Sequence, residues 1–102
     1  MYQVFRAIAD PTRRDILDRL AVQEESVMEL AKDFDMSLPA VSQHLKVLQE
    51  AKLIAGHREG RQVFYQLNPK PLREVSRWIG SYERFWRSRL NALESHLRRE
   101  HG

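Results

Sequence analysis

MELAKDFDMSLPAVSQHLKVLQEA, residues Met28 to Ala51, indicates two short helices that meet at a tight turn. Apolar residues at helical spacing mark the first helix, and they are Val27, Leu30, Ala31 and Phe34. The turn is expected at Asp35-Met36-Ser37, because Ser37 suits an N-cap and Pro39 is tolerated in a first helical turn, where N–H groups lack acceptors within the helix. A second helix should therefore start near Leu38.

This second helix has an apolar line and a polar face. At 100° per residue the apolar line carries Val41, Leu45, Leu48 and Lys52, and the polar face carries Pro39, Ser42, Gln43, Lys46 and Glu50. The apolar line is predicted to face the core. Hydroxyl, amide and cationic groups near the start of an outward face suit the DNA major groove. The stretch therefore predicts a helix-turn-helix, although a helical hairpin with a solvated face fits this stretch alone equally well.

Composition predicts one domain, residues 1–102, with an anionic partner. The chain has 102 residues, a mass of 12.1 kDa, a net charge of +3 and a sequence pI of 9.6. From Met36 to Leu67 cations outnumber carboxylates by two, so the positive bias lies on the second helix and the segment after it.

Several classes of protein are disfavoured by what the sequence lacks. It has no cysteine, no apolar run near the roughly 20 residues that span a bilayer, and no signal-peptide pattern, which predicts a cytoplasmic protein without a thiolate site or a membrane partner. Four scattered histidines, without a Gly-rich phosphate loop or a nucleophile and base at catalytic spacing, predict neither an enzyme nor a cofactor.

Two short segments precede this stretch. Tyr2 to Ala9 is amphipathic but too short to be stable alone, so it should pack on another element. Asp10 can cap a helix that has Pro11 in its first position and a buried stripe at Ile16, Leu17 and Leu20. On its wet side, Arg13 and Arg14 could contact phosphate or simply be solvated.

The segment after the helix pair predicts a β-hairpin. Strands are expected over Ile54 to Arg58 and Arg61 to Leu67, joined by a two-residue turn at Glu59-Gly60. His57, Arg58 and Arg61 lie near its tip, where arginine can reach a phosphate or the minor groove. A hairpin directly behind a helix-turn-helix is the layout of a winged helix, although charge at a tip can also serve solubility alone.

A long helix is predicted over Leu72 to Arg99. Its apolar residues recur in steps of three and four, at Val75, Ile79, Tyr82, Trp86, Leu90, Leu93 and Leu97. Such a helix would run roughly 40 Å, longer than a domain of this size can cover. We therefore expect a two-fold dimer, with an interface made of Val4, Phe5, Ile79, Tyr82, Trp86, Leu90, Leu93 and Leu97. The aromatic flank at Trp78 and Phe85 could instead line a ligand pocket.

The predicted fold class is mainly α with a β-hairpin (α+β). It is a winged helix-turn-helix with an N-terminal and a long C-terminal dimerisation helix.

Three segments resemble the arsenical-resistance-repressor (ArsR) family of bacterial winged-helix regulators. They are ADPTRRDIL at Ala9 to Leu17, SVMELAKDFDMSLPAVSQHLKVLQEAKLI at Ser26 to Ile54, and HREGRQVFYQL at His57 to Leu67. The resemblance implies a homodimeric repressor that binds double-stranded DNA at an inverted-repeat operator and is released by an inducer. It places base reading on Leu38, Pro39, Ser42 and Gln43, and phosphate contact on Lys46. His44 is expected to be structural or to contact the DNA backbone.

The chain departs from the family at its metal motifs. Ser26 and Met28 stand where metal-sensing members carry cysteines, and neither supplies a thiolate. On the last helix His96 and Glu100 share a face, whereas His101 lies on another. A metal site there would make a metal-responsive repressor, but a solvated helix end is expected. The chain thus resembles the metal-free branch, in which the inducer, where one exists, is a small molecule or a protein.

A further alternative is a winged helix that binds another protein instead of DNA. A protein interface would be expected to carry an aromatic or aliphatic anchor on the outward face, and Leu38 is the one candidate there.

Overall fold

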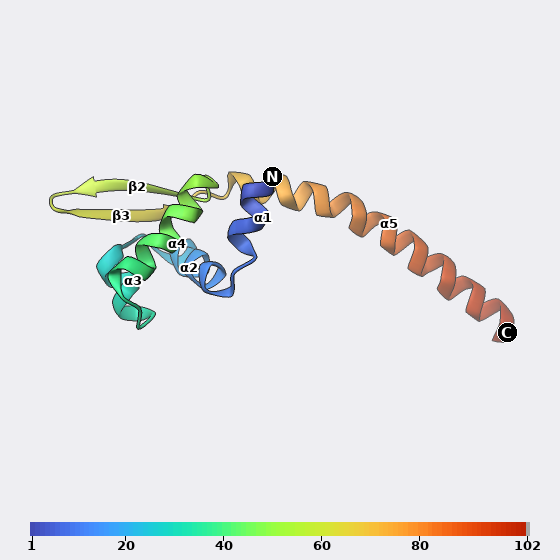
Figure 1. Cartoon of the computed structure of the whole chain (residues 1–102). Helices are drawn as coiled ribbons and strands as arrows, with labels where there is room; N and C mark the ends of the chain where they lie inside the picture. The colour runs from blue at the N-terminus through green and yellow to red at the C-terminus, as the bar shows by residue number, and fades with distance from the viewer. Residues whose placement is uncertain (102) are drawn as a thin grey trace. The chain divides into compact units, whose positions relative to one another are not determined.

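A computed structural model describes residues 1–101, with the side chains of residues 1–99 (Figure 1). The order of elements is α1-α2-β1-α3-α4-β2-β3-α5. The chain forms two compact units, Met1–Leu72 and Arg73–Gly102, and the prediction of one domain stays a prediction. Within residues 1–101, five helices with a small antiparallel sheet confirm the predicted fold class, which is mainly α with a β wing.

The first unit begins with α1 (Tyr2–Ile8) and α2 (Pro11–Val22). Asp10 caps α2 as predicted, since its carboxylate accepts the N–H of Arg13 at 3.0 Å. This hydrogen bond, with the nearby Arg13 charge, holds the pKa of Asp10 below its ordinary value of 3.8. The cap therefore stabilises the folded chain above that pH and weakens as the pH falls through the lowered pKa.

Two arginines of α2 satisfy carbonyl groups at the end of α1. Arg13 Nε donates to the carbonyl oxygen of Ala7 at 2.7 Å, and its Nη2 donates to that of Arg6 at 2.9 Å. Arg14 Nη1 donates to the carbonyl oxygen of Ile8 at 2.8 Å. Both guanidinium groups therefore hold α1 against α2 in this structure, instead of standing free for a phosphate.

The predicted helix-turn-helix is formed by α3 (Val27–Asp33) and α4 (Leu38–Glu50). Ser37 caps α4 through its hydroxyl oxygen, which accepts the N–H of Ala40 at 3.3 Å. Asp35, between the helices, has a left-handed backbone with φ of 50°. The turn and the cap therefore lie where the sequence predicts them.

The end of α4 corrects one prediction. Lys52, which was assigned to the buried line, lies beyond the helix with φ of 61° and is exposed. The N–H of Leu53 reaches back to the carbonyl oxygen of Leu48 at 3.0 Å, and that of Lys52 to Gln49 at 2.9 Å, which together form a Schellman motif. Leu53 and Leu48 are fully buried, so Leu53 takes the core position expected of Lys52.

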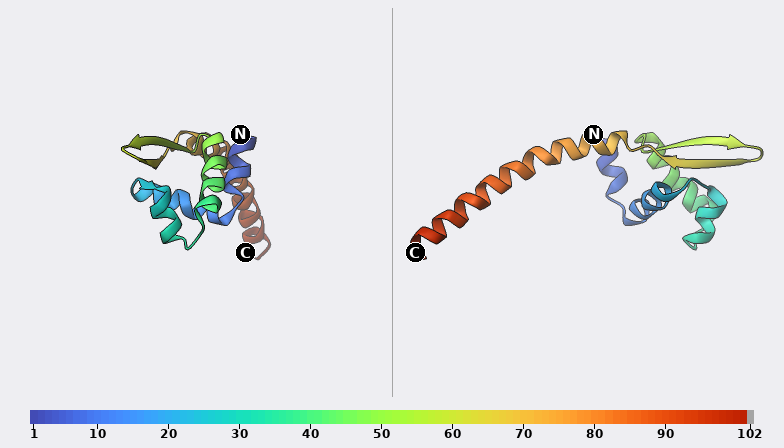
Figure 2. Two further views of the ribbon diagram at one scale, coloured as in Figure 1. Left: turned by 60° about the vertical axis from the view of Figure 1, so that its left-hand side comes forward. Right: turned by 180° about the vertical axis from the view of Figure 1, so that it is seen from behind.

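The sheet has three antiparallel strands in the order β1-β3-β2. Its hairpin consists of β2 (Ile54–Glu59) and β3 (Gln62–Leu67), which form a ribbon that projects away from α1 (Figures 1 and 2). The predicted turn was wrong by one residue, because Glu59 pairs with Gln62 and the loop is therefore Gly60-Arg61. Gly60 has φ of 63°, as the first loop residue of a type II′ turn requires.

Strand β1 (Glu25–Ser26) was not predicted. It pairs with the middle of β3, with Glu25 opposite Tyr65 and Ser26 opposite Phe64. This short strand attaches the middle of β3 to the segment between α2 and α3.

The core of the first unit is apolar and comes from all of its helices. Its fully buried side chains include Ile16, Leu30, Val41, Leu45, Leu48 and Leu53. The sequence predicted the first five as buried positions.

The last helix, α5, runs from Lys70 to His101 and extends past both ends of the predicted span. Its start is supported by Asn68, whose side-chain oxygen accepts the N–H of Lys70 at 3.4 Å. No helix among the described residues is long and apolar enough to cross a membrane. The side chains of Glu100 and His101, considered for a metal site, lie outside the described residues.

Candidate nucleic-acid interface

The outward face of α4 carries the side chains predicted to read DNA. They are Leu38, Pro39, Ser42, Gln43 and Lys46, and all are exposed. On the other face Val41, Leu45 and Leu48 are between 0% and 2% exposed. The two faces of the helix are therefore oriented as predicted, and Ser37 and Pro39 fix its start at the edge of this surface. The DNA contacts themselves stay a prediction.

His44 lies at the border of this face and is half-buried. Its Nδ1 is 3.5 Å from Nη1 of Arg13, the same arginine that holds the end of α1. Through this contact His44 links α4 to the α1–α2 pair, which fits the structural role expected of it.

The wing adds two cations to the surface of the first unit. Arg58 lies on β2 and Arg61 in the loop, and both are exposed. Among the described residues, the side chains of Lys46, Arg58 and Arg61 make no ion pair or hydrogen bond. By contrast, Arg19 lies 3.5 Å from Glu25 and 3.6 Å from Asp33. The cations predicted to meet DNA are thus unpaired, so a phosphate would not have to displace an internal partner.

The predicted interface residues differ in exposure. Val4 is buried, with 7% of its surface exposed, so it has little area to offer a partner. Phe5 is half-buried. The six on α5 are 45% to 61% exposed, and they are Ile79, Tyr82, Trp86, Leu90, Leu93 and Leu97.

The positions that carry cysteines in metal-sensing relatives have other roles here. Ser26 is 2% exposed and caps α3, since its hydroxyl oxygen accepts the N–H of Glu29 at 3.2 Å. Met28 is 62% exposed. Both border a hollow of about 230 Å³ between the start of α3 and the wing, lined by Ser26, Val27, Met28, Arg61, Gln62 and Val63. A capping serine and an exposed thioether leave this place without a thiolate pair.

Two charged features escaped the sequence reasoning. Glu25 is 1% exposed, and one of its carboxylate oxygens accepts Gln23 Nε2 at 3.1 Å and lies near Arg19. Glu24, His57 and Glu59 converge on one side of the sheet. Both depend on β1, whose two residues are too few to show a strand period, so the sequence held no signal for either.

Comparison with known proteins identifies close relatives. The family described as "Bacterial regulatory protein, arsR family" matches residues 10–55. The transcriptional repressor SdpR of Bacillus subtilis (strain 168) is 40% identical over 79 residues, covering 78% of this chain and 88% of SdpR. The HTH-type transcriptional regulator Rv2034 of Mycobacterium tuberculosis is 44% identical over 84 residues, covering 82% of this chain and 76% of Rv2034. Among solved structures, an ArsR-like transcriptional regulator from Rhodococcus sp. RHA1 superposes with a TM-score of 0.81 at 30% identity, covering 92% of this chain and 86% of that one.

Proposed function

Because this chain belongs to the ArsR family of bacterial regulators and is thus a DNA-binding transcriptional regulator, we propose that it acts in the cytoplasm as a homodimeric repressor at an inverted-repeat operator. Relatives named as repressors support the repressing role. The dimer and the operator symmetry are our inference from the seam of α5, the line of exposed apolar residues from Ile79 to Leu97.

The observation that carries this proposal is the combination of an outward face on α4 with unpaired cations beside it. Ser42 and Gln43 can bond to base edges, and Lys46 can neutralise a phosphate one turn further along the helix. Arg58 and Arg61 extend the positive surface along the wing. Hydroxyl, amide and cationic groups together match what a major groove and its phosphates offer.

Two copies of this surface would read two half-sites. In a two-fold dimer the two α4 helices would enter successive major grooves, about one DNA turn or roughly 34 Å apart, while the wings contact flanking phosphates. Repression would follow from occupancy of the operator by both helices.

Release from the operator would not use the cysteine motif of metal-sensing relatives, because Ser26 and Met28 replace it. On α5, His96 would need Glu100 as a second ligand, and the side chain of Glu100 lies outside the described residues. A small molecule or a partner protein is therefore the inducer class that we propose.

A protein-binding winged helix is the alternative, and it rests on Leu38, which is 47% exposed at the start of α4. One exposed leucine among polar and cationic side chains is a small anchor for a protein interface. The remainder of the face favours DNA.

Substitutions on α4 separate base reading from phosphate contact. Gln43→Ala should weaken binding to the selected operator by about 1–3 kcal/mol if its contact is bidentate, with little effect on random DNA. Lys46→Ala should weaken both and lower the salt slope by about 1. Fluorescence anisotropy over a series of salt concentrations measures both effects. Gln49→Ala is the matched control, because Gln49 is exposed near the C-terminal end of the same helix, away from the N-terminal part that is proposed to read bases.

The operator itself can be found by selecting bound fragments from random DNA with the purified chain. Enrichment of an inverted repeat is the expected result. Failure to enrich any sequence, or equal losses on operator and random DNA for Gln43→Ala, would contradict base reading by α4.

A further inference from the structure

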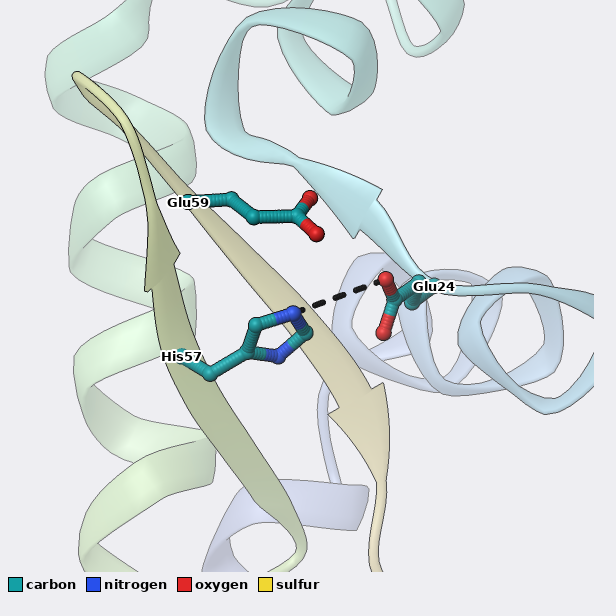
Figure 3. Close-up of side chains that lie close together, drawn as sticks. All are labelled: Glu24, His57 and Glu59. Carbon is teal, nitrogen blue, oxygen red and sulfur yellow. Dashed lines mark ion pairs between the residues drawn. The ribbon is translucent and has the colours of Figure 1, made fainter.

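Three potential metal ligands converge on one side of the sheet, where the wing faces the segment before β1 (Figure 3). His57 and Glu59 lie two residues apart on β2 and so share a side of the strand. Glu24 reaches them from the segment just before β1, and its Oε1 lies 3.6 Å from Nε2 of His57 (Figure 3). One ligand atom from each of the three residues lies within 4.8 Å of the others.

The imidazole of His57 is oriented toward the carboxylates by its neighbour on β3. Its ring stacks on Phe64, the cross-strand partner of His57, with centroids 6.1 Å apart and planes inclined by 26°. The stacking limits rotation of the ring while Nε2 faces Glu24. An imidazole nitrogen close to two exposed carboxylates is a favourable starting geometry for a metal.

The cluster has more negative charge than its histidine can offset. Even a protonated imidazole would balance one of the two carboxylates, and Glu59 has no cationic partner among the described side chains. All three residues are exposed, with side-chain exposures of 44% for His57 and 41% for Glu24. A hydrated cation can therefore reach them without any rearrangement of the fold.

We propose that Glu24, His57 and Glu59 bind a divalent transition cation of the zinc class. Zinc accepts imidazole nitrogen and carboxylate oxygen at about 2.0–2.2 Å, which places tetrahedral ligands about 3.4 Å apart. The separation of 3.6 Å between Nε2 of His57 and Oε1 of Glu24 is close to this ligand–ligand distance. Rotation of the exposed Glu59 side chain can bring its carboxylate to a similar distance from both atoms. Water completes the fourth position. One nitrogen with two oxygens suits Zn²⁺ or Co²⁺ better than Mg²⁺, which prefers oxygen ligands and octahedral geometry.

The bound cation would strengthen DNA binding, a consequence that rests on the proposed function. It adds two positive charges to the wing next to Arg58 and Arg61, where the proposed phosphate contacts lie. It also ties β2 to the segment before β1, which restrains the wing that carries these arginines. The cation would therefore strengthen repression, whereas an inducer would weaken it by releasing the chain from the operator.

Cation binding is measured on the full chain without DNA, so its outcome does not depend on the repressor function. Co²⁺ gives a visible absorption that reports a tetrahedral site, and Zn²⁺ competing with a chromophoric chelator gives the affinity. We expect one site per chain, and an affinity at least about tenfold weaker in His57→Gln, Glu59→Gln and Glu24→Gln, because even second-shell changes cost 10–100-fold. His96→Gln is the matched control and should keep the site.

Two outcomes would overturn the cation site. Binding lost in His96→Gln but kept in His57→Gln would place the cation on α5, and no saturable binding would leave His57 and Glu24 as an ion pair only. DNA binding is then measured with and without Zn²⁺. We expect a several-fold gain at low salt that shrinks as salt rises and is absent in Glu59→Gln. An unchanged affinity despite a bound cation would refute the effect on repression, while the site itself would stand.

Discussion

Helices α4 and α5 have the same kind of amphipathic pattern, but the apolar side is buried in α4 and exposed in α5. In α4 the apolar line at Val41, Leu45 and Leu48 is at most 2% exposed. In α5 the corresponding residues, from Ile79 to Leu97, are 45% to 61% exposed. A periodic pattern therefore predicts a helix and a face, and other elements decide whether that face is covered within the chain.

The difference also separates two kinds of surface. In α4 the exposed side is polar and cationic, which suits a wet and charged partner. In α5 the exposed side carries leucine and aromatic rings, and edge contacts such as the 5.2 Å pair of Trp78 and Tyr82 lie along the helix itself. A contiguous apolar stripe of this kind marks an association surface. We therefore propose that α4 contacts DNA and that α5 contacts the second copy of the chain.

The largest expected effect tests the buried half of this comparison. Leu45→Ala should lower the free energy of unfolding by about 2–5 kcal/mol, because it removes a fully packed side chain and leaves a cavity. Leu93→Ala, a substitution of the same size on α5, should cost less than about 1 kcal/mol at protein concentrations where the chain is monomeric. Urea denaturation of both variants gives the two values. Equal losses at low concentration would mean that Leu93 is packed within the protomer.

Trp86, near the middle of the exposed apolar side of α5, tests whether that side is an interface. Trp86→Ala should weaken the dimer by about 2 kcal/mol or more, which is about 30-fold in the dissociation constant, because Trp86 is 61% exposed in the single chain and large enough to be an interface anchor. Sedimentation equilibrium over a range of concentrations measures the shift toward monomer. Arg87→Ala, a neighbour that pairs with Glu83 off the seam, is the control and should leave the dimer intact. A Trp86→Ala dimer of wild-type affinity would remove α5 from the proposed interface.

The same comparison explains what the sequence could predict. Helix caps at Asp10 and Ser37 were found because a capping side chain acts on backbone groups within three residues. The outward face of α4 followed from its period, and the long α5 from its unbroken seam. Local chemistry was therefore sufficient to predict the helices and the orientation of the outward face of α4.

Features that depend on distant partners could not be predicted in this way. Strand β1 exists because Glu25 and Ser26 find the free edge of β3, about forty residues away along the chain. The convergence of Glu24 with His57 depends in turn on that pairing. Lys52 was misassigned for a local reason, since the helical period was extended past a residue that adopts a left-handed turn.

The smallest expected effect concerns the point where α4 ends and its buried line stops. Lys52 holds φ of 61°, a conformation that is strained for side chains with a Cβ and free of strain for glycine. Lys52→Gly should therefore raise the free energy of unfolding by about 0.5 kcal/mol, since relief of strain is partly offset by the greater freedom of the unfolded chain. Lys46→Gly is the matched control, because the same change inside α4 should cost about 1 kcal/mol. Opposite signs in thermal or urea unfolding would place the end of α4 between these two lysines. Destabilisation by both substitutions would show that Lys52 continues the helix. The apolar line of α4 would then extend one turn further, from Leu48 to Lys52.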